Sequence, residues 1–158
     1  MPTIAKVDHG ALKANQLAII ILNLVAFVAD RWPVAAAVAL VMAAGSLVGK
    51  PGFLPLYRFI LKPLGVVKAD ILDDDPRPHR FAQGFGAVVL LSGSIALSGG
   101  ATVFGWTAVW IVILLAAVNV FAGFCAGCFV FYQLARLKVP GFSGTPPAGT
   151  FPGMRPRG

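Results

Sequence analysis

Four long apolar stretches separated by short polar segments make up most of the chain. They cover about residues 12–29, 33–48, 81–97 and 106–132. A helix needs roughly 20 apolar residues to cross a bilayer, so the pattern predicts four transmembrane helices. The second stretch is short and would cross only with local thinning of the bilayer. The fold class predicted from this pattern is an all-α integral membrane protein.

The polar breaks group these helices into two hairpins. Residues 30–33 suffice only for a tight turn, and Pro33 suits the first turn of the following helix. Residues 98–100 read Ser-Gly-Gly and provide the second turn. The first and second helices should therefore be antiparallel neighbours, as should the third and fourth.

The remaining segments are predicted to lie outside the membrane. Residues 53–62 mix aromatic, aliphatic and basic side chains with proline, which is typical of a segment lying along the headgroups. Residues 73–75 are three aspartates, which we expect to form a solvated acidic turn rather than a cation site. Residues 139–158 are rich in proline and glycine with terminal arginines, and predict a disordered basic tail.

Composition supports a membrane protein and argues against a nucleic-acid binder. Apolar residues make up 58% of the chain and charged residues only 12%, whereas about a quarter of a soluble domain is charged. The formal net charge is +7, but the basic residues lie at the ends of apolar stretches rather than among aromatics on a polar surface. The partner predicted from this arrangement is the lipid bilayer.

The basic residues also predict an orientation. Every lysine and arginine except Arg31 falls on one side of the four predicted crossings. Lysine and arginine are enriched in cytoplasmic segments. Both termini are therefore expected in the cytoplasm.

A short motif occurs before each predicted hairpin. An acidic residue is followed five positions later by a basic residue, and three positions after that by glutamine. This is expected of two parallel hairpins related by a pseudo-twofold axis along the membrane normal; a chance match is the alternative. Lys13, Gln16, Arg80 and Gln83 would then surround a shared cytoplasmic vestibule. The matched positions are Asp8 with Asp75, Lys13 with Arg80, and Gln16 with Gln83.

The two cysteines of the chain form one C-x-x-C pair, Cys125 and Cys128, inside the fourth stretch. Residues three apart share a helix face, so the two sulfurs can approach each other, bind one soft metal ion, or exchange with a sulfur donor. The alternative is that both act as small apolar core residues. Gly123 and Gly127 form a small-xxx-small pattern, which predicts close packing of another helix.

Depth restricts what such a pair can do. Cys128 lies eight residues before Arg136, about 12 Å of helix from the cytoplasmic surface. Because apolar surroundings raise the pKa of a thiol and make it a poor nucleophile, reaction requires a water-filled cleft or a nearby cation. Arg80 is the candidate that would stabilise a thiolate or an incoming anion; its alternative role is a headgroup anchor. Gln83, one turn deeper, would line the same cleft or bond a neighbouring helix.

Other polar residues receive structural assignments. Asn23 and Asn119 fall near the middle of the first and fourth crossings, where buried amides need partners, and we expect them to pair and lock these helices together. His9 and His79 have no second histidine or cysteine at ligand spacing, so we expect both to be solvated and predict no metal site. The sequence assigns no cofactor.

Two motifs resemble a known family. Asp75-Pro76-Arg77-Pro78-His79-Arg80-Phe81-Ala82-Gln83 and Gly123-Phe124-Cys125-Ala126-Gly127-Cys128, together with Asp8 and Asn15-Gln16, are similar to bacterial membrane proteins grouped as domain of unknown function 4395. The resemblance implies a multi-pass protein of the bacterial cytoplasmic membrane and names no reaction. Where the family pattern often has an acidic residue after the second cysteine, this chain has Phe129, which argues against a mechanism that needs a carboxylate beside the thiols.

Three functions follow from these observations, and whether the protein is an enzyme stays open. The first is a thiol redox or sulfur-handling site that works with a cytoplasmic thiol protein. The second is an accessory or assembly subunit of a larger membrane complex. The third is a carrier for a soft metal ion or a sulfur-containing anion, although the methionines form no relay that leads to the thiols.

Overall fold

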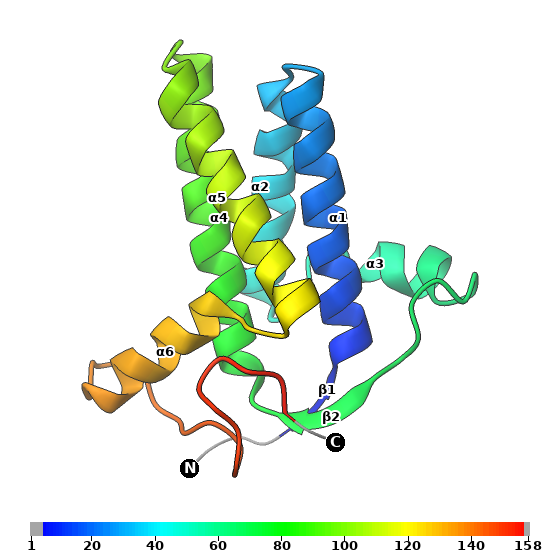
Figure 1. Cartoon of the computed structure of the whole chain (residues 1–158), viewed down its shortest axis with the longest axis vertical. Coiled ribbons are helices and arrows are strands. Elements are labelled where there is room, and N and C mark those ends of the chain that lie inside the picture. Colours follow the sequence, from blue (N-terminus) through cyan, green and yellow to red (C-terminus); the bar gives the residue numbers. More distant parts are fainter. Residues whose placement is uncertain (1–4, 157–158) are drawn as a thin grey trace.

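Four long helices stand side by side and form the body of the molecule (Figure 1). The computed structural model describes residues 5–156. The long helices are α1 (His9–Val28), α2 (Trp32–Val48), α4 (Pro76–Ser98) and α5 (Thr102–Ala122). The shorter elements are β1 (Ala5–Asp8), α3 (Leu54–Leu56), the π-helical turn η1 (Tyr57–Leu61), β2 (Ile71–Asp74) and α6 (Ala126–Arg136).

Three of these helices, α1, α4 and α5, are long and apolar enough to cross a membrane by length and composition. The fourth, α2, has 17 residues and is equally apolar but shorter. Large apolar side chains cover the outside of the bundle; Val28, Val103 and Phe121 are each more than 80% exposed. An apolar surface of this extent is not expected in water. The prediction of a helical membrane protein is confirmed to this extent.

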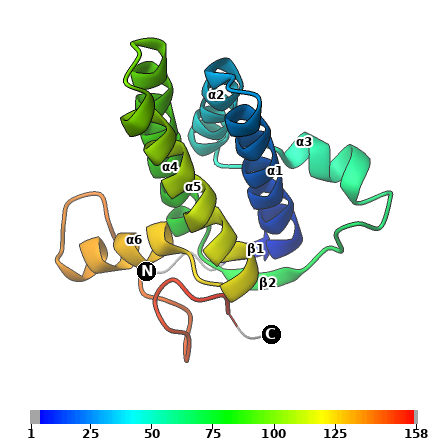
Figure 2. The same cartoon turned by 45° about the horizontal axis from the view of Figure 1, so that its top comes forward.

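The two ends of the bundle differ. The turns between α1 and α2 and between α4 and α5 lie at one end, and every other element lies at the opposite end (Figure 1). In the turned view, α3 and α6 project to opposite sides of the bundle, and β1 and β2 lie at its lower end (Figure 2). We call this end of the bundle the base.

The fourth apolar stretch is two helices rather than one. α5 ends at Gly123, whose φ of 65° is left-handed and whose N–H bonds the carbonyl of Asn119. A glycine in this conformation commonly ends a helix because it lacks a Cβ that would clash. The chain then turns and restarts as α6, which lies across the base (Figure 1). The prediction of one crossing over 106–132 is wrong, and the cysteine pair lies at the junction rather than within a crossing.

The all-α prediction also missed a two-stranded antiparallel sheet. β1 pairs with β2, with Ala5 opposite Asp74 and Asp8 opposite Ile71. The ladder joins the segment before α1 to the segment before α4. It therefore brings together the chain segments that precede the two hairpins.

The two strands lead into helices that start in the same way. Asp8 caps α1 by accepting bonds from the backbone N–H groups of Gly10 and Ala11, at 2.9 and 3.3 Å. Asp75 caps α4 by accepting a bond from the backbone N–H of Arg77 at 3.0 Å. An aspartate at this position satisfies N–H groups that have no partner inside the helix. The acidic residue of each repeated motif is thus an N-cap.

The core is built from small and branched side chains between the four long helices. α1 packs against α5 and α4 against α2, in addition to the contacts within each hairpin. Ile19, Leu90 and Val109 are fully buried at the centre. Close approach requires small residues: a Cβ on Gly93 would lie 2.8 Å from the Cβ of Ala108. This packing fixes the ends of α1, α4 and α5 around one region of the base.

Candidate functional site

Cys125 and Cys128 form a disulfide at the start of α6. Cys125 is the N-cap of that helix, and its Sγ accepts a hydrogen bond from the backbone N–H of Cys128 at 3.2 Å. Both residues are buried, at 6% and 3% exposed. The disulfide therefore lies at the N-terminus of α6, where free backbone N–H groups attract negative charge.

Gly127 fixes how close α6 comes to α4. A Cβ at Gly127 would lie 2.5 Å from the Cβ of Ala82 and 2.7 Å from its Cα. Only glycine permits this approach. Gly123 has a different role, because it ends α5 in a left-handed conformation. The contact at Gly127 places the cysteine pair against the first turns of α4.

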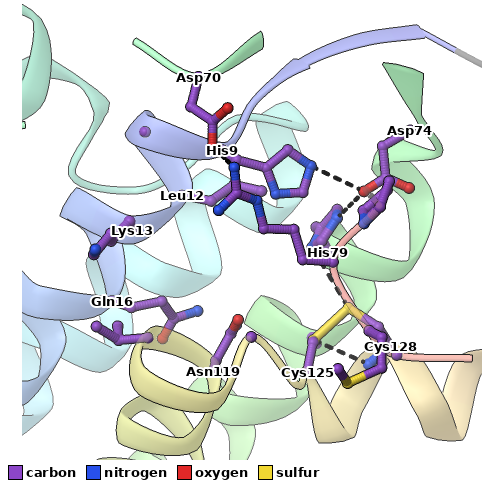
Figure 3. A pocket seen from close by; sticks show the side chains of 18 of the residues that line it. His9, Leu12, Lys13, Gln16, Asp70, Asp74, His79, Asn119, Cys125 and Cys128 are labelled. Atoms are coloured by element: carbon purple, nitrogen blue, oxygen red, sulfur yellow. Dashed lines mark hydrogen bonds and ion pairs between the residues drawn. A yellow bond between two sulfur atoms is a disulfide. The ribbon is translucent and has the colours of Figure 1, made fainter. Parts of the chain in front are cut away.

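His79, on the first turn of α4, lies beside the disulfide. Its Nδ1 is 3.5 Å from the Sγ of Cys128, and its Nε2 is 2.9 Å from Oδ2 of Asp74 (Figure 3). A carboxylate only accepts hydrogen bonds, so Nε2 carries a proton, and the tautomer with its single proton there presents the lone pair of Nδ1 to Cys128. The imidazole of His79 thus lies between the sulfur of Cys128 and the carboxylate of Asp74 and contacts both.

Asp74 lies between two histidines. Its Oδ2 is also 3.1 Å from Nε2 of His9, and its Oδ1 accepts a bond from the backbone N–H of Asp75 at 2.8 Å. Burial opposes ionisation of Asp74, but the hydrogen bond from His79, the close contact with His9 and the charge interaction with His79 outweigh it, and the pKa of Asp74 is lowered. The group beside His79 is therefore a carboxylate at neutral pH.

The disulfide and the histidines line a cavity of about 1020 Å³ at the base. α1 contributes His9, Lys13 and Gln16 to its wall, and the end of α5 contributes Asn119 (Figure 3). Tyr132 of α6 also lines it; burial, then the nearby charges of Asp74 and Asp75, raise its pKa to about 12, so it remains a neutral phenol. The walls thus combine the sulfurs with hydrogen-bonding and basic side chains.

The C-terminal segment lies along the junction of α5 and α6. The backbone N–H of Cys125 donates to the carbonyl of Gly153 at 2.7 Å, and the N–H of Arg155 donates to that of Gly123 at 3.0 Å. Arg155 also pairs with Asp70 of the segment before β2. Residues 153–155 therefore form part of the cavity wall directly over the cysteine pair.

Arg80 does not lie beside the thiols. Its guanidinium donates to the carbonyls of Ser46 and Leu47 at the end of α2, and it is not among the residues that line the cavity. Arginine commonly satisfies such free carbonyls at a helix C-terminus. The place expected for Arg80 is taken by His79, whose ring points to the other side of α4.

Gln83 joins helices rather than lining the cavity. Its Nε2 donates to the carbonyl of Met42 at 2.9 Å, and its Oε1 accepts from Asn15 at 3.4 Å. Asn15 in turn accepts from the backbone N–H of Phe53 at 2.9 Å. This buried network ties α1, α2 and α4 together above the base, which is one of the two roles expected for Gln83.

Asn23 and Asn119 do not form the pair expected of them. The amide of Asn23 donates to the carbonyl of Ile19 in its own helix at 2.8 Å, and its Oδ1 has no partner among residues 5–156. Asn119 lies at the end of α5 and faces the cavity (Figure 3). The two residues lie at different depths because α5 ends at Gly123, so Asn119 is near the base rather than the middle.

Sequence reasoning missed three residues of the site, namely His9, Asp74 and His79. The prediction that His9 and His79 are solvated is wrong, since their side chains are only 9% and 20% exposed. The acidic turn is also mostly buried: Asp74 and Asp75 are 4% and 3% exposed, and only Asp73 is solvated. The available signal was the position of His79 within the same family-like motif as Arg80 and Gln83. Its closeness to Cys128, 49 residues away, depends on the break after α5.

Two kinds of chemistry fit this arrangement. The sulfurs can cycle between disulfide and dithiol, with His79 placed to accept or return a proton. The second is metal binding: the ligand atoms of His79, Cys125 and Cys128 lie within 4.8 Å of one another, as do those of His9, Asp74 and His79, and the two sulfurs become ligands once the disulfide is opened.

Comparison with known proteins gives one result. The model of the family described as "Domain of unknown function (DUF4395)" matches residues 7–136. The match covers all four long helices, β2, α6 and the second half of β1, and it confirms the resemblance seen in the motifs. No curated protein and no solved structure matches the chain.

Proposed function

We propose that this chain, which belongs to the family of domain of unknown function 4395, carries out thiol–disulfide exchange at the cytoplasmic face of the bacterial inner membrane. The observation that carries the proposal is the position of the Cys125–Cys128 disulfide. It lines a cavity of about 1020 Å³ and lies beside an imidazole that is itself bonded to a carboxylate. A disulfide that served only as a structural link would need neither neighbour.

In the proposed topology α1, α2, α4 and α5 cross the membrane as two hairpins and the base faces the cytoplasm. The charge distribution supports this orientation, because the basic residues of the described part of the chain lie at or next to the base, except Arg31 in the turn between α1 and α2. Such an excess marks the cytoplasmic side. α2, at 17 residues, would span about 26 Å and require modest local thinning.

The proposed repeat has support from the strand register. Asp8 and Asp75 are 67 residues apart. The same offset relates Ala5 to Leu72 and Val7 to Asp74, so exchanging the two strands carries the pair Ala5–Asp74 onto the pair Leu72–Val7. The ladder is thus symmetric about Lys6 and Asp73 under the offset of the motif. The packing of α1 on α5 and of α4 on α2 has the same symmetry, as expected of two parallel hairpins related by a twofold axis.

The exchange is balanced by two thiols from a cytoplasmic partner. The first partner thiolate attacks Sγ of Cys125, the S–S bond breaks, and Cys128 leaves with the bonding electron pair. The second partner thiolate attacks the partner sulfur of this mixed disulfide and releases Cys125 as a thiolate. The two protons that the partner thiols give up pass to Cys128 and Cys125, so the protein gains two electrons and two protons and the partner leaves as a disulfide. The reverse reaction reduces an incoming disulfide.

His79 is placed to handle the proton of Cys128. The first partner thiol gives its proton to Nδ1 of His79 and becomes the attacking thiolate; when Cys128 leaves, Nδ1 passes that proton to it across the 3.5 Å contact, and in the reverse direction Nδ1 accepts the proton back. Asp74 holds the proton on Nε2 in both states and stabilises the imidazolium. Lys13 and Gln16, which line the same cavity, would bind the polar or anionic part of the partner.

Reduction of the folded protein tests this function. Protein in lipid nanodiscs is incubated with a dithiol, quenched with an alkylating reagent, and weighed intact by mass spectrometry. We expect the native protein to gain two alkyl groups, and His79→Asn to gain them at least tenfold more slowly, within the range found for general acid–base groups. The matched control is Lys6→Gln, because Lys6 is exposed and lies on β1, the strand that pairs with the strand of Asp74. This variant should react like the native chain.

One result would refute the proposal. If the disulfide is reduced only after denaturation, the pair is a structural link. The accessory-subunit function would then be favoured instead, and it would require a partner that co-purifies in fixed ratio.

A further inference from the structure

The ligand atoms of His79, Cys125 and Cys128 form a compact set. Nδ1 of the histidine and the two sulfurs lie within 4.8 Å of one another, with all three residues at the cavity wall. We propose that the dithiol form of the protein binds one thiophilic divalent cation, of the Zn²⁺ class, through these three atoms. The proposal rests on the proposed function in one respect, because it needs the disulfide to be opened by a thiol.

The donor set favours a soft or borderline cation. Two thiolates and one imidazole are the ligands typical of Zn²⁺, and a magnesium or calcium site would be built from oxygen. Cysteines at C-x-x-C spacing commonly supply two ligands to one ion. Here the backbone supports the pair, since Cys125 caps α6 and its sulfur is held over the first turn of that helix.

The surroundings of His79 match those of a metal-binding histidine. Ligating histidines generally donate their second ring N–H to a carboxylate or carbonyl, which fixes the ring and its tautomer. His79 donates Nε2–H to Asp74 at 2.9 Å, and this leaves the lone pair of Nδ1 directed to the sulfurs. Asp74 is itself held by the N–H of Asp75 and lies 3.1 Å from His9. The ring is therefore already oriented without an ion.

Charge also fits. A divalent cation with two thiolates and a neutral imidazole has no net charge, so its burial costs less than that of a charged complex. The two thiols release two protons when the ion binds. Both cysteines are more than 90% buried, and a neutral complex is the form expected in such surroundings.

The cavity leaves room for a fourth ligand. Three protein ligands with one open position are typical of zinc sites that act on or exchange a ligand, whereas purely structural sites have four protein ligands. A water molecule or a small thiolate can occupy the remaining position from the cavity of about 1020 Å³. Binding and the disulfide exclude each other, because oxidation removes both sulfur ligands.

The second cluster, formed by His9, Asp74 and His79, is less suitable for an ion. The two imidazole Nε2 atoms lie 3.1 and 2.9 Å from the same carboxylate oxygen. These separations are those of hydrogen bonds or ion pairs, so the cluster is explained by its own contacts. We assign it the role of orienting His79.

Cobalt binding under anaerobic conditions tests the proposal. Protein in nanodiscs is reduced with a phosphine, freed of reductant, and titrated with Co²⁺, while thiolate-to-cobalt charge-transfer absorption is recorded. We expect one equivalent to bind to the reduced protein and displacement by Zn²⁺. The oxidised protein, identical in sequence, should show no such absorption. This comparison needs no variant and is unaffected by folding defects.

Variants locate the ligands. We expect His79→Asn to weaken binding by more than tenfold, and Asp74→Asn to weaken it by about 10–100-fold, as is found for groups that orient metal ligands. Asp73→Asn is the matched control, because Asp73 is exposed and pairs only with Lys6 among the described residues; its affinity should not change. The absorption of His79→Asn should also shift, which a purely structural role would not cause.

Two results would overturn the proposal. One is the absence of thiolate-to-cobalt absorption in protein whose two thiols have been counted by alkylation. The other is binding that His79→Asn leaves unchanged. Either result leaves thiol–disulfide exchange intact, whereas a disulfide that resists reduction in the folded protein refutes the exchange function itself. The two failures are therefore distinguishable.

Discussion

Replacing Asp74 by asparagine should slow oxidation of the cysteine pair by about tenfold. The substitution keeps the size of the side chain and removes its charge. Oδ1 of residue 74 accepts the N–H of Asp75 at 2.8 Å, and an asparagine Oδ1 can keep this bond. Its Nδ2 then faces His79 as a donor, so Nε2 of His79 must accept and the ring proton moves to Nδ1. The lone pair that receives the proton of Cys128 is lost.

The size of the effect follows from the lost interaction. A hydrogen bond to a charged group contributes about 1.5–3 kcal/mol and a neutral one about 0.5–1.5 kcal/mol. The difference of about 1–1.5 kcal/mol in stabilising the imidazolium corresponds to a rate lowered about 5–12-fold. The tautomer change acts in the same direction, so a tenfold decrease is the expected value.

The assay is the oxidation of reduced protein by a small disulfide, followed by alkylation and intact mass. Asp73→Asn on the same strand is the control, because its side chain is 63% exposed and does not contact the histidines. The deficit of Asp74→Asn should shrink as the pH rises above about 8.5, where thiols ionise without a base. Equal rates for the two variants at neutral pH would refute the role of the Asp74–His79 pair.

Three further predictions concern the structure around the site. Gly127→Ala should lower the free energy of unfolding by about 1–3 kcal/mol, because its Cβ would lie 2.5 Å from a Cβ of α4. The decrease should be seen as a lower thermal midpoint. Burial opposes ionisation of Asp8, but its hydrogen bonds outweigh this and lower its pKa. Its contribution to stability is therefore present above about pH 4 and lost as the pH falls further, so Asp8→Asn should flatten the acid dependence of thermal unfolding. Deleting residues 139–158 removes the bond from Cys125 to Gly153 and should speed reduction of the disulfide by a dithiol.

Much of the fold could be predicted from the hydrophobic pattern together with the proline and glycine residues that interrupt it. The bounds of α2 and the turns after α1 and α4 follow from Pro33 and the Ser-Gly-Gly segment, because proline and glycine have strong positional preferences. The break at Gly123 was not predicted. Apolar residues continue on both sides of it, and composition does not show that a glycine has adopted a left-handed conformation.

The site, like the fold, could be predicted only in part from the sequence. Local spacing identified the cysteine pair and the packing role of Gly127. The partners of the pair could not be found from spacing, since His79 and Asp74 come from segments that the strand pairing and the α4–α6 contact bring to the base. Arg80 illustrates the reverse error. It lies on the correct turn of α4, but adjacent residues of a helix point in different directions. Arg80 therefore faces α2, and His79, one residue earlier, faces the cysteine pair.

The central claim is that the cysteine pair reacts reversibly with thiols from the cytoplasmic side. We would measure alkylation of Cys125 and Cys128 by a membrane-impermeant reagent, after treatment with a membrane-impermeant dithiol, in inverted and right-side-out vesicles. We expect inverted vesicles to gain two alkyl groups after treatment with the dithiol and none without it, and right-side-out vesicles to remain unmodified. Modification only in right-side-out vesicles, or in neither preparation, would contradict it.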